Sequence, residues 1–218
     1  EIDTSKLTTE DDSGNRGLIL MVQEKYKIDL GLPSENISDL RDAMMVSYPL
    51  KDVERLADRD YISDVMLNKN IDIEDYVESI VVYNKIISSQ KSIPIDKQTE
   101  EGYELTHLVW ALHTIVKDNH LLRTYKEFMI NSLINLYKRI DFATDVSTET
   151  LYFISEIDSF YLQENWIMNL ESQQGSNGAF TGETPKGFSK QNLVLLQVHH
   201  TSLALLTLYN FYNGSNSN

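Results

Sequence analysis

Residues 103–116 read YELTHLVWALHTIV and are apolar on two opposite faces of a helix. A helix that is apolar all round is buried on both sides, so this stretch predicts an inner helix of an all-α protein. Residues 193–211 have the same character and predict a second inner helix. The two stripes of the first stretch are Leu105, Leu108, Leu112 and Val116, and opposite them Tyr103, His107, Trp110, Ala111 and Thr114.

The rest of the chain also favours helices, because only four prolines and nine glycines interrupt 218 residues. We expect one all-α domain at 15–212, built of antiparallel helical hairpins. A flexible acidic segment at 1–14 and a disordered tail at 213–218 are expected to flank it. Apolar periodicity predicts helices at 15–28, 36–48, 51–67, 72–89, 101–117, 121–141, 147–171 and 190–212.

The composition excludes several classes of function. With 33 acidic and 19 basic residues the net charge is −14, which repels phosphate backbones, so we expect no nucleic-acid partner. Cysteine is absent, which removes disulfides, thiolate nucleophiles and Cys-ligated metals. The longest apolar run, LVLLQVHHTSLALLTL, is interrupted by Gln197, His199 and His200, so we expect no membrane span. No cofactor is expected.

The first residue is Glu1 rather than Met, as in a trimmed or mature form. This slightly favours a periplasmic or secreted protein and leaves the compartment open.

Two short segments resemble each other and predict how the inner helices meet. HLVWAL, which begins at His107, and HTSLAL, which begins at His200, share a histidine, a large apolar residue three positions later, and Ala-Leu. Such a repeat favours consecutive hairpins whose inner helices face one another. We therefore expect His107 to lie opposite His200.

Residues 169–182, NLESQQGSNGAFTG, hold three of the nine glycines. Gln174 is followed by Gly178 four positions later and then by Phe180. This spacing resembles the latter half of the Gln-x-x-x-Gly-x-Trp element of terpene cyclases and related α/α-toroid proteins, with Phe180 in place of Trp. The resemblance implies an incomplete α/α toroid or a short superhelix. It also implies that these three residues form a structural clasp, in which the glutamine ties one helix to the next.

The chemistry of that family does not follow from the resemblance. An Asp-x-Asp-Asp run is absent, and the zinc-dependent prenyltransferase-like relatives need a cysteine that this chain lacks. The glycines do not have P-loop or dinucleotide-binding spacing either. The resemblance therefore supports the fold and the clasp only.

The candidate site residues lie on the two inner helices. Glu104 and His107 are three positions apart on one helix face, and they are the catalytic candidates. His199 and His200 point about 100° apart, so only one of them is expected to face the same cleft as His107. Three interpretations stay open: a zinc site, a His/Glu acid–base pair, and a core histidine pair; the last is favoured, and no metal is expected. The ligand-binding candidates are Tyr103, Trp110, His199 and His200.

A run of carboxylates follows residue 140. It could include a glycosidase-type pair, although a solvated acidic face is the favoured interpretation. The run comprises Asp141, Asp145, Glu149, Glu156 and Asp158.

The leading functional expectation is a non-catalytic binding or interaction protein of bacterial type. Its ligand, a small molecule, glycan or peptide, would occupy a concave aromatic- and His-lined cleft near His107, Trp110 and His200. The alternative is a hydrolase or lyase acting on a glycan or peptide, with Glu104 or His107 as acid–base. The oligomeric state is left open.

Overall fold

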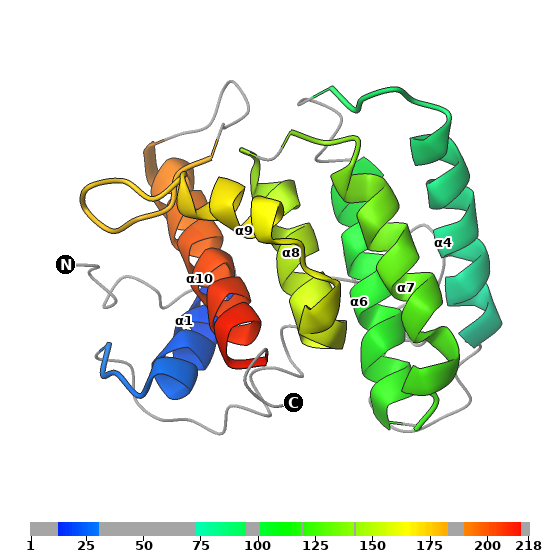
Figure 1. The fold of residues 1–218 in the computed structure, drawn as a ribbon, viewed down its shortest axis with the longest axis horizontal. Helices are drawn as coiled ribbons and strands as arrows, with labels where there is room; N and C mark the ends of the chain where they lie inside the picture. The colour runs from blue at the N-terminus through cyan, green and yellow to red at the C-terminus, as the bar shows by residue number, and fades with distance from the viewer. Residues whose placement is uncertain are drawn as a thin grey trace. The chain divides into compact units, whose positions relative to one another are not determined.

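The structure is a computed structural model and describes residues 13–30, 73–94, 101–118, 120–141, 143–182 and 190–214. These residues form seven α-helices and no strand, so the prediction of an all-α protein is confirmed (Figure 1). The helices predicted at 36–48 and 51–67 lie outside the described residues. The elements are α1 (Ser13–Tyr26), α4 (Ile73–Ser88), α6 (Tyr103–Asp118), α7 (Leu122–Tyr137), α8 (Asp145–Asp158), the 3-10 turn η5 (Ser159–Tyr161), α9 (Glu164–Glu171) and α10 (Lys190–Gly214).

None of the helices that the structure describes is both long enough and apolar enough to cross a membrane.

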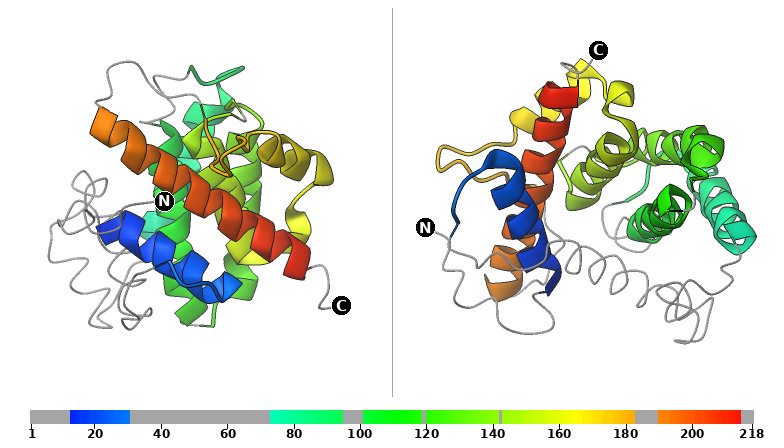
Figure 2. Two further views of the ribbon diagram at one scale, coloured as in Figure 1. Left: turned by 90° about the vertical axis from the view of Figure 1, so that its left-hand side faces the viewer. Right: turned by 90° about the horizontal axis from the view of Figure 1, so that it is seen from below.

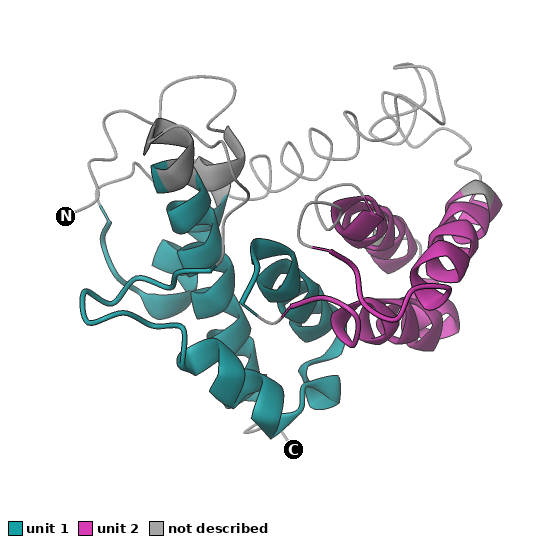
Figure 3. Ribbon diagram, turned by 90° about the horizontal axis from the view of Figure 1, so that it is seen from above, with its two compact units in different colours: residues 1–44, 142–218 teal, residues 45–141 magenta. Residues whose placement is uncertain are grey.

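The chain divides into two compact units, each with its own internal contacts (Figure 3). Unit 1 comprises residues 1–44 and 142–218, and unit 2 comprises residues 45–141. Each unit is described by itself below.

Unit 2 is a packed set of three helices, α4, α6 and α7, seen nearly end-on in the right-hand view of Figure 2. Every side chain from Leu105 to His113 on α6 is buried, as the apolar pattern on both of its faces predicts. Full burial of a Leu or Ile side chain contributes roughly 1.5–3 kcal/mol. The fully buried side chains of this core include Ile80, Ile87, Leu105, Leu112, Met129, Ile130, Leu133 and Leu136.

A polar seam joins α4 to α7 within unit 2. The side-chain amide of Asn84 donates to Ser132 Oγ at 2.7 Å, and that of Asn135 donates to Asn84 Oδ1 at 3.1 Å and to Ser88 Oγ at 3.0 Å. Paired amides and hydroxyls satisfy one another where the helices meet, so the seam fixes the register of the two helices.

Unit 1 is centred on α10, against which both α8 and α1 pack (Figures 1 and 2). The core side chains include Leu20, Leu151, Tyr152, Leu203 and Leu206, all at most 2% exposed. One polar network links the three helices. Lys25 on α1 donates to Glu156 Oε1 on α8 at 3.0 Å and to Asn210 Oδ1 on α10 at 2.6 Å.

The single helix predicted at 147–171 is wrong, because the chain breaks into α8, η5 and α9. The Asp158 side chain accepts from Phe160 N at 3.0 Å and caps η5, and α8 ends at this residue. Leu162 is then extended, with φ −71° and ψ 134°. The start also differs: α8 begins at Asp145, and the Thr144 side chain caps it by accepting from Ser147 N.

Candidate functional site

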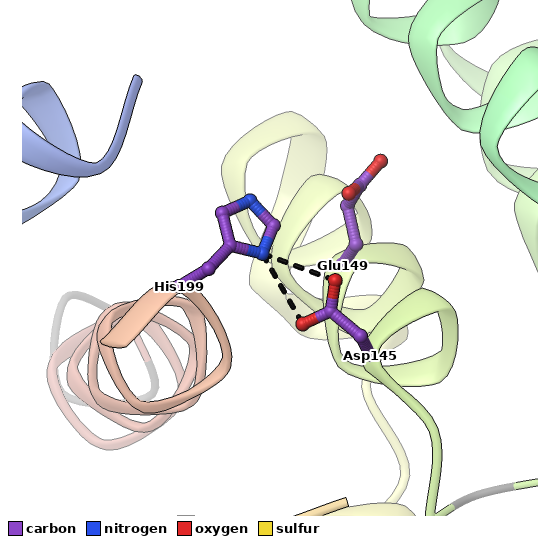
Figure 4. Close-up of side chains that lie close together, drawn as sticks. All are labelled: Asp145, Glu149 and His199. Atoms are coloured by element: carbon purple, nitrogen blue, oxygen red, sulfur yellow. Dashed lines mark hydrogen bonds and ion pairs between the residues drawn. The ribbon is translucent and has the colours of Figure 1, made fainter. Parts of the chain in front are cut away.

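Two carboxylates lie on one face at the start of α8. The Thr144 cap fixes the first turn, in which Asp145 is the first residue and Glu149 follows one turn later. A carboxylate in the first turn interacts favourably with the positive end of the helix dipole, which helps to explain why Asp145 is accommodated there. Figure 4 shows these two side chains with His199, which approaches from α10.

His199 and His200 both contact Asp145, although consecutive side chains on a helix diverge by about 100°. His199 Nδ1 lies 3.2 Å from Oδ1 and 3.1 Å from Oδ2 of the carboxylate. His200 Nδ1 lies 3.6 Å from Asp145 Oδ1. The carboxylate therefore sits between the two rings. We call Asp145, Glu149, His199 and His200 the carboxylate–imidazole cluster.

The other ring nitrogen of His200 is held by two oxygen atoms. Nε2 lies 3.1 Å from Thr148 Oγ1 and 3.2 Å from Gln173 Oε1. Gln173 Oε1 only accepts hydrogen bonds, and the Thr148 hydroxyl donates to Thr144 O, so the proton of the neutral ring belongs on Nε2. Burial lowers the pKa of His200 from 6.5, against an opposing effect of Asp145, and His199 lowers it further.

Burial sets the cluster apart from a surface charge pattern. Asp145 is 7% exposed, Glu149 2% and His200 2%. The favoured interpretation of these carboxylates as part of a solvated acidic face is therefore wrong for Asp145 and Glu149. The His199 side chain is 12% exposed and is the more accessible of the two histidines in the cluster.

The arrangement supports two kinds of chemistry. One donor atom from each of Asp145, Glu149 and His199 lies within 4.8 Å of the other two, a spacing that could hold a metal ion. A carboxylate that accepts from imidazole Nδ1 also orients the ring for proton transfer at Nε2. Both uses draw on the same pair, Asp145 and His199.

The loop between α9 and α10 contains the residues expected to form a clasp. Gln174 donates to Gly178 O at 3.1 Å within the loop, and Gly178 has φ 83°, a conformation that glycine adopts readily. Phe180 is 1% exposed, and its N–H donates to Thr201 Oγ1 on α10 at 3.1 Å. Of these three residues, Phe180 thus makes the hydrogen bond to the next helix, whereas the family pattern assigns that role to the glutamine.

The same loop contacts the cluster. Gln173, next to Gln174, accepts from His200. A Cβ added at Gly182 would lie 2.8 Å from His200 Cε1 and 2.5 Å from Ala143 O, so only glycine fits at this close approach. The loop therefore helps to fix the His200 ring.

The remaining predicted site residues lie on α6 in unit 2. Tyr103 and His107 have ring centroids 5.6 Å apart, and His107 is 9% exposed. Trp110 stacks on His113 with centroids 5.2 Å apart and an interplanar angle of 3°. Glu104 is in the first turn of α6. Because His200 belongs to unit 1, the expected pairing of His107 with His200 would join two units, and it stays a prediction.

The sequence singles out His199 and His200, and it presents Asp145 and Glu149 as members of a carboxylate run, but it does not pair these carboxylates with the histidines. The signal available was the four-residue spacing of Asp145 and Glu149 directly after a good helix cap. The contact itself joins residues 54 positions apart and depends on how α8 packs on α10. A comparison of the chain with protein-family models, curated proteins and solved structures finds no match, so the functional argument depends on this geometry.

Proposed function

We propose that the protein is a binding protein whose ligand site is the carboxylate–imidazole cluster of unit 1. The observation that carries the proposal is the burial of Asp145 and Glu149 one turn apart on the same helix. Like charges at this spacing repel each other, and buried carboxylates lose hydration. Buried ionisable groups that interact closely with one another are common where a protein binds a ligand or catalyses a reaction.

The donor set favours a ligand that carries positive charge. Two carboxylates supply negative charge and acceptor oxygens, and the low pKa of His200 keeps that ring neutral near pH 7. A cationic group would offset the repulsion between Asp145 and Glu149. The partly exposed His199 side chain offers a route by which a small ligand reaches the site.

Isosteric neutralisation tests the proposal without knowledge of the ligand. In metal-free buffer, Glu149→Gln should lower the free energy of unfolding less than the loss of a carboxylate in a defined ion pair does, because it also removes the repulsion from Asp145. The matched control is Glu156→Gln, which alters a carboxylate of the same helix that accepts from Lys25 and Asn210. That control should lose about 1–3 kcal/mol. If Glu149→Gln loses as much as the control in urea unfolding, the cluster is structural and the proposal fails.

A second candidate function is a hydrolase or lyase that uses the same pair as an acid–base. The observation that favours it is the 3.1 Å contact of His199 Nδ1 with Asp145, which fixes the tautomer and leaves Nε2 for proton transfer. The test is hydrolysis of nitrophenyl glycosides and peptide nitroanilides by the wild-type protein and by His199→Gln. Equal background rates for the two proteins would eliminate this candidate.

We also propose that the helical hairpins belong to an incomplete α/α toroid. The support is the loop between α9 and α10, whose buried Phe180 is tied to Thr201. An experimental structure in which inner helices from both units form one curved layer would support this arrangement. Two lobes without a shared inner layer would contradict it.

A further inference from the structure

We propose that Asp145, Glu149 and His199 bind a divalent transition-metal ion of the zinc type. The inference deepens the proposed function and rests on it, because it names the ligand of the same cluster. It also departs from the expectation, drawn from the sequence, that the chain binds no metal. The three donors come from α8 and α10 of unit 1 (Figure 4).

The distances between donor atoms suit one small ion. Two ligand atoms at ordinary zinc bond lengths and tetrahedral angles lie about 3.3 Å apart. His199 Nδ1 lies 3.1–3.2 Å from the two oxygens of Asp145. A donor atom of Glu149 lies within 4.8 Å of the other two, so a modest rotamer adjustment would complete the set. In the metal-bound form, the ion replaces the proton that His199 Nδ1 shares with Asp145.

The chemistry of the donors selects among ions. One imidazole and two carboxylates form a mixed nitrogen and oxygen set, which suits zinc and its neighbours among the transition metals. Calcium and magnesium prefer oxygen donors, and calcium requires six or more of them. The ion would neutralise two buried negative charges, so its binding relieves the repulsion that the proposed function identifies.

Neighbouring side chains hold the donors in position. Thr144 caps the turn that carries Asp145, and Asp145 Oδ1 lies 3.6 Å from His200 Nδ1. His200 is held in turn through Nε2 by Thr148 and Gln173. With its proton on Nε2, the His200 ring does not donate to Asp145, and it limits the movement of that carboxylate by packing beside it. Side chains behind metal ligands commonly change metal affinity by about 10- to 100-fold, so Thr144 and His200 are positioning residues in this proposal.

Titration with Zn²⁺ tests the inference. Protein freed of metal with a chelator is titrated with zinc chloride in a calorimeter and against a competing chromogenic chelator. The wild-type chain should bind one Zn²⁺, and His199→Gln and Asp145→Asn should each weaken binding at least about tenfold. Circular dichroism verifies that each variant is folded. If one variant is not folded, the other and Glu149→Gln provide the comparison.

Two exposed residues provide matched controls. Glu171→Gln removes a surface carboxylate of unit 1, and His120→Asn removes a surface histidine of unit 2 at a positive φ of 59° that Asn tolerates. Both should bind Zn²⁺ as the wild-type chain does. Equal affinity in the cluster variants and the controls would mean adventitious surface binding and would overturn the inference.

The metal inference and the proposed function fail in different ways. If the wild-type chain binds no Zn²⁺ at 100-fold excess while Glu149→Gln loses less stability than Glu156→Gln, only the metal inference fails. If Glu149→Gln is strongly destabilised without metal, the cluster is structural and the proposed function fails as well.

Discussion

At His200, a buried ring is held next to a carboxylate and a second imidazole. Burial is the main cause that lowers the pKa of this ring from 6.5. Asp145 raises the pKa, and His199 lowers it further. The unfolded chain therefore binds a proton at this residue more readily than the folded chain. The stability that depends on neutral His200 is present above pH 6.5 and is lost as the pH falls from 6.5 through the folded-state pKa.

The substitution His200→Gln tests this linkage. The wild-type chain should lose more free energy of unfolding between pH 7.5 and pH 5 than the variant, because Gln does not titrate. Urea unfolding in chelator at several pH values measures the difference, and His120→Asn should keep the wild-type pH dependence. A variant whose stability falls as steeply as that of wild type would show that His200 is not responsible.

The backbone at Gly178 allows a second test at the residue scale. Its φ is 83°, and a Cβ there would meet nothing within 4 Å, so any loss on substitution comes from the backbone. Gly178→Ala should cost about 1 kcal/mol, and Gly178→Asn should cost less, because Asn adopts this conformation more readily. The measurement is urea unfolding. Two variants as stable as wild type would show that the loop does not need this conformation.

At the scale of elements, Lys25 connects three helices of unit 1. Lys25→Met would leave the Glu156 carboxylate without its cation and should lower the free energy of unfolding by about 1–3 kcal/mol. A larger loss is not expected, because the Lys25 side chain is 27% exposed and water partly screens the pair. Adding Glu156→Gln should restore part of the loss, which a double-mutant cycle in urea measures. Simple addition of the two single losses would contradict a coupled network.

The elements differ in how far the sequence predicts them. The apolar residues on both faces of α6 predict its burial, because the periodicity of one helix determines which faces must be covered. The break after α8 is harder to predict, since the local sequence allows Asp158 either to continue a helix or to cap a turn. The contact of Asp145 with His199 depends on the packing of α8 on α10, which local periodicity does not contain.

At the scale of the whole molecule, the cluster and its supporting loop both belong to unit 1. Because unit 2 has its own core and polar seam, Zn²⁺ should slow amide hydrogen exchange in α8 and α10 and leave α4 and α7 unchanged. Exchange followed by mass spectrometry, with and without Zn²⁺, measures this. Protection spread equally over both units would contradict a site confined to unit 1.

We propose that the buried cluster on α8 and α10 is a ligand site that binds a metal ion. Anomalous X-ray diffraction at the zinc edge from crystals grown with Zn²⁺ would locate that ion. We expect one strong peak about 2.0–2.2 Å from donor atoms of Asp145, Glu149 and His199. A peak at surface residues alone, or no peak beside these three side chains, would contradict it.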